Sequence, residues 1–213
     1  MYDYIAIEGN IGAGKTTVSG LLREELGAKE ILESFKDNPF LPRFYQDPRN
    51  NALPLELFFL AERYHQLKEH FAAPDLFAQR TVADYFIGKS LVFAKNNLDD
   101  HELRLFRNLY DIMFGQLPRP DLVVYLHKDI QGLQENIKKR GRSYEQSIAD
   151  RYLEEVHQGY MDFLKQQTHL RSVILATDGL DFVQDKSHFA RLLQVIHRNY
   201  PSGVTYVDLR QDI

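Results

Sequence analysis

One segment near the start of the chain constrains its fold more than any other. Residues 4–7 (YIAI) form a short apolar run that predicts a β-strand, and residues 9–16 (GNIGAGKT) match the phosphate-loop pattern G-x-x-x-x-G-K-[ST]. Residues 17–26 carry apolar side chains at helical spacing and end before Gly27, which predicts a helix. In this order, backbone N–H groups and a helix N-terminus point toward an anion. The segment therefore predicts a binding site for a nucleoside triphosphate.

Two side chains of the loop add to this expectation. Lys15 supplies a full positive charge for the phosphates, and the hydroxyl of Thr16 is suited to bind Mg²⁺. The residues expected to contact the triphosphate are Gly9, Asn10, Ile11, Gly12, Ala13, Gly14, Lys15, Thr16 and Thr17.

The composition limits the classes of protein to which the chain can belong. With 213 residues, of which 44% are hydrophobic, residues 1–213 suit one domain with a sizeable core. The net charge of -4 argues against a nucleic-acid partner bound through general basicity, and the absence of cysteine excludes disulfides and thiolate metal sites. No apolar run approaches the length of a membrane span, and the chain begins directly with its first strand, so we expect no membrane partner, no signal peptide and a cytoplasmic location.

Strand and helix patterns alternate along the chain after the loop. Strands are predicted at 28–35, 81–84, 121–126 and 172–176, and helices at 53–72, 100–115, 129–140, 145–168 and 185–199. The run 121–126 (DLVVYL) is almost continuously apolar, as expected for a parallel strand covered on both faces. This order predicts an α/β fold with a doubly wound parallel sheet of about five strands. Residues 203–207 could form an edge strand or a packed extension.

Carboxylates follow two of the predicted core strands. Glu33 ends the run that follows the first helix, and Asp84 ends the buried run 81–84. In open α/β sheets, ligands bind at the carboxyl ends of the strands. Both residues are therefore candidates for a site beside the phosphate loop, although a glutamate at a strand end is equally consistent with a surface position.

A long predicted helix, 53–72, carries a polar stripe beside its apolar one. Glu56 and Arg63 lie seven residues apart on the same face, too far apart to pair directly. They could face a polar ligand or solvent. The preceding loop contains Phe40, Phe44 and Tyr45, which are too many aromatic residues for a free linker.

A cationic segment lies between two of the later helices. The helix 129–140 ends in Lys138-Lys139-Arg140 and is followed by Gly141-Arg142. Such a run is usually a solvated helix end. Here a second helix follows the break, which predicts a helical lid at about 138–146 that can close on phosphates.

Taken together, these residues resemble the deoxynucleoside kinase family, whose members phosphorylate the 5′-hydroxyl of deoxynucleosides. The resemblance covers roughly residues 3–190. It rests on the phosphate loop, on the segments that carry Glu33, Tyr45 and Asp84, on FFLAER with Arg63, and on the lid sequence KKRGRSYEQSI. It implies a P-loop kinase fold, ATP as the phosphoryl donor, a Mg²⁺ cofactor and a role in nucleotide salvage.

The resemblance also implies roles for individual residues. Glu33 would be the general base beside the 5′-hydroxyl, or would share that task with positioning Mg²⁺, and Asp84 together with Thr16 would bind Mg²⁺, directly or through water. The other implied roles are the lid cations Arg140 and Arg142 on the transferring phosphoryl group, Tyr45 and Glu145 on the sugar 3′-hydroxyl, and Arg63 near the 5′-oxygen. These roles suit phosphoryl transfer, which depends on positioning and charge neutralisation.

The sequence departs from the family pattern in three places. The acidic-Arg-Ser motif is Asp84-Tyr85-Phe86, and Lys89 is a candidate to replace its arginine. The usual base-binding glutamine is Glu56, which only accepts hydrogen bonds and therefore suits the two adjacent donors of guanine, so we expect a purine preference. An arginine expected one turn before Arg140 is Asn136.

Two other activities remain as alternatives. A thymidylate kinase-like nucleoside monophosphate kinase shares the loop and lid but needs cations near its acceptor phosphate, where this chain places carboxylates. A GTP switch usually carries an N-K-x-D segment, which this sequence lacks. The apolar faces of helices 53–72 and 100–115 would also allow a homodimer.

Overall fold

The computed structural model describes residues 2–33, 38–72 and 80–210. Its centre is a parallel sheet of six strands in the order β2-β3-β1-β4-β5-β6. The strands span Tyr4–Gly9 (β1), Lys29–Ile31 (β2), Thr81–Ala83 (β3), Leu122–His127 (β4), Arg171–Ala176 (β5) and Gly203–Asp208 (β6). The predicted doubly wound α/β class is therefore confirmed.

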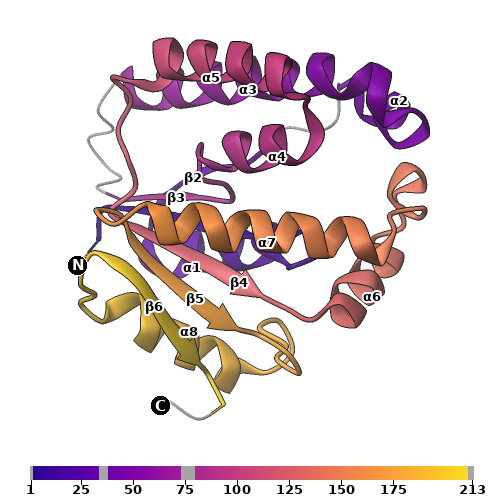
Figure 1. Cartoon of the computed structure of the whole chain (residues 1–213). Helices are drawn as coiled ribbons and strands as arrows, with labels where there is room; N and C mark the ends of the chain where they lie inside the picture. Colours follow the sequence, from indigo (N-terminus) through magenta and orange to yellow (C-terminus); the bar gives the residue numbers. More distant parts are fainter. Residues whose placement is uncertain (1, 34–37, 73–79, 211–213) are drawn as a thin grey trace.

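Helices cover both faces of this sheet (Figure 1). They span Lys15–Leu26 (α1), Leu41–Gln46 (α2), Pro48–Ala72 (α3), Lys89–Asn97 (α4), Asp100–Phe114 (α5), Ile130–Arg140 (α6), Asp150–Gln166 (α7) and Lys186–His197 (α8), with a 3₁₀ turn at Ser143–Glu145. Helices α3, α4, α5 and α7 lie on one side of the sheet, and α1 and α8 lie on the other (Figure 1). Among the described residues, no helix combines the length and apolar character needed to cross a bilayer.

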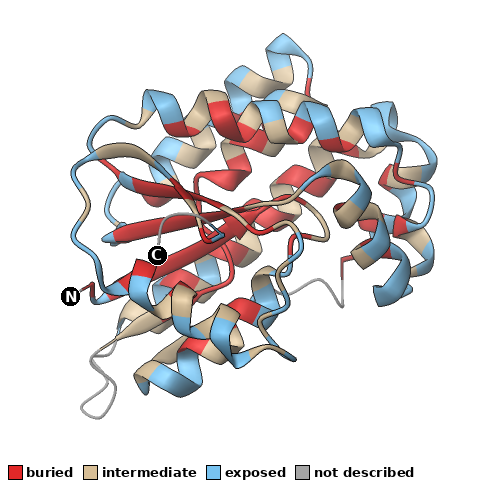
Figure 2. Ribbon diagram, turned by 90° about the horizontal axis from the view of Figure 1, so that it is seen from below, coloured by how far each residue is buried: buried red, intermediate tan, exposed pale blue. Residues whose placement is uncertain are grey.

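The alternation of side chains along β1 divides the interior into two cores. Tyr4 and Ala6 belong to the core under α3, α4, α5 and α7, whereas Ile5 and Ile7 belong to the core that includes α1, α6 and α8. All four side chains are buried, as expected for a central parallel strand. Figure 2 shows the buried residues gathered along the strands and the inner faces of the helices. The sheet is thereby a fixed platform for the loops at its carboxyl edge.

The number of strands is one more than predicted. The sequence of residues 203–207 is compatible with either an edge strand or a packed extension. In the structure this segment forms β6, which pairs in parallel with β5, with Gly203 opposite Arg171 and Asp208 opposite Ala176. Most of its residues are only partly buried, which explains why the segment lacks a continuous apolar run.

Other boundaries also differ from the prediction. The second strand stops at Ile31, so that Glu33 lies beyond its end, and residues 34–35 of the predicted strand lie outside the described residues. Helix α3 begins at Pro48 within the predicted loop, because proline is favourable in the first turn of a helix. The predicted helix 145–168 begins only at Asp150, after the 3₁₀ turn.

Candidate active site

The phosphate loop connects β1 to α1 and is held from two sides. The side chain of Asn10 is buried and its Nδ2 donates to the carbonyl of Leu153 in α7 at 2.7 Å. On the other side, Nδ2 of Asn136 in α6 donates to the carbonyl of Gly12, also at 2.7 Å. Gly12 has a φ of 84°, and a Cβ there would lie 2.6 Å from the carbonyl oxygen of Leu133. Only glycine therefore fits this close approach of the loop to α6.

Lys15 is the first residue of α1 and its ammonium turns back over the loop. Its Nζ donates to the carbonyl oxygens of Gly9 and Asn10, both at 3.0 Å. Burial, together with the nearby charge of Lys89, lowers the pKa of Lys15 to about 8. The ammonium is therefore fixed at the loop, where it would lie against a bound polyphosphate.

Asp84 connects the loop to the two neighbouring strands. One carboxylate oxygen accepts from the Thr16 hydroxyl at 2.7 Å, and the other accepts from the backbone N–H of Glu33 at 2.6 Å. Burial raises the pKa of Asp84, and the nearby charge of Glu33 raises it further. The predicted pair of metal ligands, Thr16 and Asp84, is therefore in direct contact at the carboxyl edge of the sheet.

Glu33 is buried and lies between two cations. Its Oε1 accepts from Nε of Arg63 at 2.8 Å and also from Nη2, and its Oε2 accepts from Nζ of Lys89 at 2.7 Å. Arg63 further donates to the Ser90 hydroxyl at 2.7 Å. Although burial alone would raise it, the charges of Lys89 and Arg63 hold the pKa of Glu33 at about 2. Glu33 is therefore a fixed carboxylate at neutral pH.

A further carboxylate lies beneath this cluster. Glu8, in β1, is almost fully buried and accepts from the backbone N–H of Phe86 at 2.6 Å and from the Tyr160 hydroxyl at 2.9 Å. Burial raises its pKa, opposed by the charges of Lys89 and Lys15. These bonds tie β1 to the segment that leads into α4 and to α7.

Two pockets open beside these residues and share a boundary. One, of about 620 Å³, lies between α3, α4 and α7, and the other, of about 1080 Å³, follows the phosphate loop. Both are lined by Lys15, Glu33, Arg140 and Arg142. The shared residues therefore lie where a ligand in one pocket would meet a ligand in the other.

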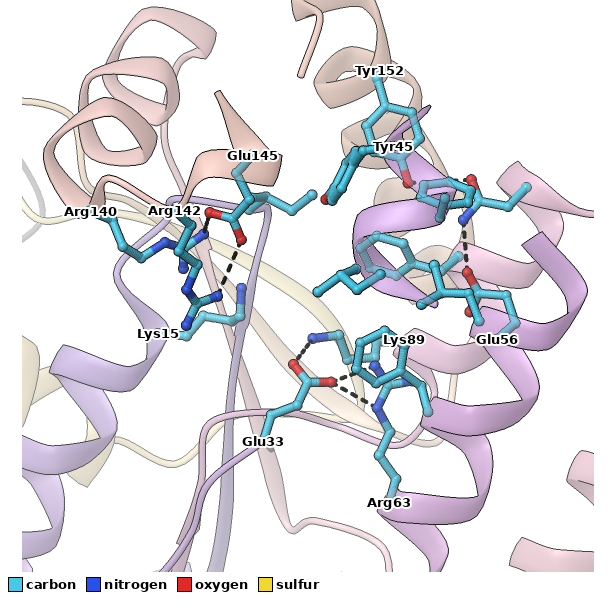
Figure 3. A pocket seen from close by; sticks show the side chains of 17 residues that line it. Lys15, Glu33, Tyr45, Glu56, Arg63, Lys89, Arg140, Arg142, Glu145 and Tyr152 are labelled. Carbon is cyan, nitrogen blue, oxygen red and sulfur yellow. Dashed lines mark hydrogen bonds and ion pairs between the residues drawn. The ribbon is translucent and has the colours of Figure 1, made fainter. Parts of the chain in front are cut away.

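The far end of the smaller pocket carries a second polar group. Figure 3 shows Glu56 on the opposite side of this pocket from Lys15 and Arg140. Glu56 is buried and its Oε1 accepts from Nδ2 of Asn97 at 2.8 Å. Burial raises the pKa of Glu56 to about 7, against the lowering effect of the Asn97 hydrogen bond. The sequence allows Glu56 and Arg63 to face either a polar ligand or solvent. In the structure both side chains are buried and line the pocket.

The segment predicted as a lid, residues 138–146, places its charges between the two pockets. Glu145, in the 3₁₀ turn, is buried and pairs with Arg140 and with Nη1 of Arg142, the latter at 3.2 Å. Next to it, the ring of Tyr144 stacks on Tyr45 with a centroid separation of 6.1 Å. Glu145 thus holds both lid arginines at the mouth of the pocket (Figure 3).

The structure brings the predicted site residues together around the two pockets. Lys15, Glu33, Arg140 and Arg142 line both pockets. The larger pocket is also lined by Gly12, Gly14, Thr16, Thr17 and Asp84, and the smaller one by Ile11, Tyr45, Glu56, Arg63 and Glu145. Of the predicted loop residues, Gly9, Asn10 and Ala13 line neither pocket. Sequence reasoning did not identify Glu8, Ser90, Asn97 or Tyr152 as members of the site. A polar residue within an otherwise apolar strand was a usable signal for Glu8, but Asn97 and Tyr152 become visible only once their partners are known.

The amino-acid sequence is similar to those of known nucleoside kinases. The sequence profile of the deoxynucleoside kinases matches residues 5–200 of the chain. A deoxyguanosine kinase of Bacillus subtilis is 37% identical over 196 residues, which are 89% of this chain and 93% of that protein. A deoxyadenosine/deoxycytidine kinase of the same species is 29% identical over 203 residues, 92% of this chain and 94% of that protein.

Solved structures give the same result at the level of the fold. A deoxyadenosine kinase from M. mycoides with bound dATP superposes with a TM-score of 0.75 at 25% identity, covering 92% of this chain and 99% of its own. The same enzyme with dCMP and dCDP superposes equally well, at 26% identity, covering 91% of this chain and 98% of its own.

Proposed function

Because the chain belongs to the deoxynucleoside kinase family, we propose that its two adjoining pockets hold the two substrates of one reaction. In that reaction the γ-phosphoryl group of ATP is transferred to the 5′-hydroxyl of a deoxynucleoside. The observation that carries the proposal is the boundary of the pockets, where Lys15, Glu33, Arg140 and Arg142 line both. A donor phosphate and an acceptor hydroxyl would meet there between three cations and one carboxylate.

The residues at this boundary have separate tasks. Lys15 and the loop N–H groups neutralise the donor phosphates, and Arg140 and Arg142 stabilise the charge on the group in transfer. Glu33 orients the 5′-hydroxyl and accepts its proton. Because the transition state of phosphoryl transfer is loose, that proton leaves late, and orientation matters more than basicity. A carboxylate with a pKa of about 2 can meet this demand.

A Mg²⁺ ion fits the group formed by Thr16 and Asp84. The hydroxyl and the carboxylate lie 2.7 Å apart, and oxygen ligands of this kind, completed by substrate phosphates and water, are the ones that Mg²⁺ prefers. When bound, the ion would neutralise charge on the β- and γ-phosphates.

The smaller pocket would hold the nucleoside with its sugar toward the lid. Tyr45 and Glu145 would bind the 3′-hydroxyl, and Arg63 would lie near the 5′-oxygen through its pairing with Glu33. The base would then reach Glu56, whose carboxylate suits the adjacent donors of guanine and supports a purine preference.

A nucleoside monophosphate kinase is the less suitable alternative. The acceptor of such an enzyme carries a dianionic phosphate, which needs cations around it. In this pocket Arg63 and Lys89 are already paired with Glu33, and Glu145 faces the same space. A neutral hydroxyl is therefore the better acceptor.

The wider setting of the activity is also part of the proposal. Phosphorylation of free deoxynucleosides with ATP is a salvage reaction, and we place it in the cytoplasm.

We further propose a homodimer through α3 and α5, because Leu105 and Ile112 lie seven residues apart on α5 and are 50% and 80% exposed. Sedimentation analysis of the native chain and of Ile112→Glu would test this pairing, and a monomeric native chain would exclude it.

One screen tests the proposed function directly. The purified chain is incubated with ATP and Mg²⁺, with each of the four deoxynucleosides, with each of their 5′-monophosphates, or with no acceptor, and the phosphorylated product and ADP are measured together. A kinase of this family forms both products in equal amounts and only with an acceptor. ATP hydrolysis that does not depend on a nucleoside, or phosphorylation of a monophosphate in preference to a nucleoside, would contradict it.

A further inference from the structure

Asn97 is the last residue of α4 and lines the pocket beside Glu56. Its Nδ2 lies 2.8 Å from Glu56 Oε1 and donates one of its two protons to that oxygen. The chain of contacts continues on the other side of the amide, where Oδ1 accepts from the Tyr152 hydroxyl and from Asn96 Nδ2, both at 3.3 Å.

These contacts fix the orientation of the Asn97 side chain. An amide turned over would place its oxygen against the ionised Glu56 carboxylate, where two acceptors would meet, and its NH₂ group against Nδ2 of Asn96. The Tyr152 hydroxyl can donate or accept and suits either orientation. The hydrogen bonds are satisfied only when the NH₂ group lies next to the carboxylate. Asn97 is thus a fixed donor at this wall of the pocket, with its second proton not engaged by the described residues.

Glu56 contributes the other half of the group. Its second oxygen, Oε2, accepts no hydrogen bond from the residues that the structure describes, and it is not sealed within the protein. From Asn97 to Glu56, the wall therefore presents a donor followed by two acceptors. The Watson–Crick edge of guanine presents the complementary order, with the O6 acceptor followed by the N1–H and N2 amino donors.

We propose that Asn97 and Glu56 form one recognition group that selects guanine, in which Asn97 donates to O6 while Glu56 accepts from N1–H and from the 2-amino group. This proposal rests on the proposed function, since it requires a nucleoside in the smaller pocket. It adds Asn97 as a specificity-determining residue and narrows the purine preference to 6-oxopurines.

The same group disfavours the other bases. Adenine presents an amino donor where guanine has O6, so that it would face the NH₂ group of Asn97, and its N1 acceptor would face the Glu56 carboxylate. Cytosine also presents a donor beside an acceptor. A site built to hydrogen-bond particular polar groups rejects analogues that leave its own groups unpaired.

Base analogues separate the contribution of each residue. Deoxyinosine keeps O6 and N1–H but lacks the 2-amino group, whereas 2-aminopurine deoxyriboside keeps the 2-amino group but lacks O6 and N1–H. The kcat/KM values of deoxyguanosine and these two analogues are measured for the native chain and for Asn97→Ala at a pH of about 9, so that Glu56, whose pKa is about 7 and is lowered by the Asn97 hydrogen bond, is ionised in both chains. The matched control is Lys95→Ala, an exposed position on the same helix that lines neither pocket.

The proposal predicts a pattern across substrates rather than a general loss. Asn97→Ala should lower kcat/KM for deoxyguanosine and deoxyinosine by the same factor, about tenfold for one hydrogen bond, and leave 2-aminopurine deoxyriboside nearly unchanged. Lys95→Ala should change none of the three. An equal loss on all three substrates would assign Asn97 a purely structural role, and no loss on either 6-oxopurine would remove it from recognition. A native chain that phosphorylates no nucleoside would instead contradict the proposed function itself.

Discussion

The ammonium of Lys89 lies 2.7 Å from Oε2 of Glu33 and completes an ion cluster with Arg63 on the other carboxylate oxygen. The exposed fractions of these side chains are 6% for Lys89, 4% for Arg63 and 2% for Glu33. The residue directly after Asp84 is Tyr85, and the second cation beside Glu33 is supplied by the first residue of α4. A buried carboxylate between two cations is stable only while both are present.

Replacement of Lys89 therefore tests the cluster. In Lys89→Met, Glu33 loses one of its two partners, and we expect a loss of about 3 kcal/mol in the free energy of unfolding together with a lower kcat. Lys89→Arg keeps the charge and should recover most of both. Denaturant unfolding and steady-state kinetics measure the two effects. If Lys89→Met has the same free energy of unfolding and the same kcat as the native chain, the ion pair contributes to neither stability nor activity.

The same cluster predicts acid sensitivity. The pKa of Glu33 is lower in the folded chain than in the unfolded one, so its contribution to stability is complete above the ordinary carboxyl pKa of about 4.5 and is lost as the pH falls toward about 2. In Lys89→Met that pKa should rise, so that the loss begins at a higher pH. Thermal unfolding as a function of pH compares the two chains, and coincident curves would show that Lys89 does not control the ionisation of Glu33.

Glu33→Gln separates orientation of the acceptor from binding. The amide keeps the shape of the side chain but removes the charge between Lys89 and Arg63 and cannot accept the proton of the 5′-hydroxyl. We expect kcat to fall by about 10²-fold or more, with a smaller change in the dissociation constant of the nucleoside. Kinetics and calorimetric titration give the two numbers. An unchanged kcat would transfer the proton-accepting role to Asp84.

Lys15→Ala removes the cation at the phosphate loop. Because Lys15 lines both pockets, its loss should lower phosphoryl transfer by at least about 10²–10³-fold, while nucleoside binding in the smaller pocket is retained. Product formation and nucleoside titration check the two halves of this statement. Near-normal turnover in the variant would contradict the proposed mechanism as a whole.

The sequence predicted the residues that a local pattern can specify. Glu33 and Asp84 were found because the carboxyl ends of parallel strands share one edge, and Lys15 and Thr16 because their spacing in the loop is characteristic. The residues with which they interact could not be predicted from such local patterns. The contact between Asp84 and Thr16 joins positions 68 residues apart in the chain and depends on β3 lying next to β1 in the sheet.

Residues that depend on packing between distant elements could not be predicted in this way. Asn136 stands where an arginine was expected, and only the close approach of α6 to Gly12 shows that its amide holds the phosphate loop. Asn97 acquires a role only because α4 ends beside α3. The helical stripe that carries Glu56 is compatible with either a ligand or solvent, so the sequence alone does not predict its environment. The structure shows that Glu56 is buried.

The ionisation of Glu56 should make base preference depend on pH. Burial raises its pKa to about 7, while Asn97, Arg63 and Lys89 lower it and Glu33 raises it. Above that pH the carboxylate offers two acceptors to guanine. Below it, the protonated acid offers a donor beside an acceptor, which fits adenine better.

The ratio of kcat/KM for deoxyguanosine to that for deoxyadenosine should therefore fall as the pH is lowered from about 8 to about 6, since kcat/KM follows the pKa values of the free enzyme. In Glu56→Gln, which cannot ionise, the ratio should be lower at pH 8 and independent of pH. A pH-independent ratio in the native chain, or the same pH dependence in the variant, would show that Glu56 does not contact the base.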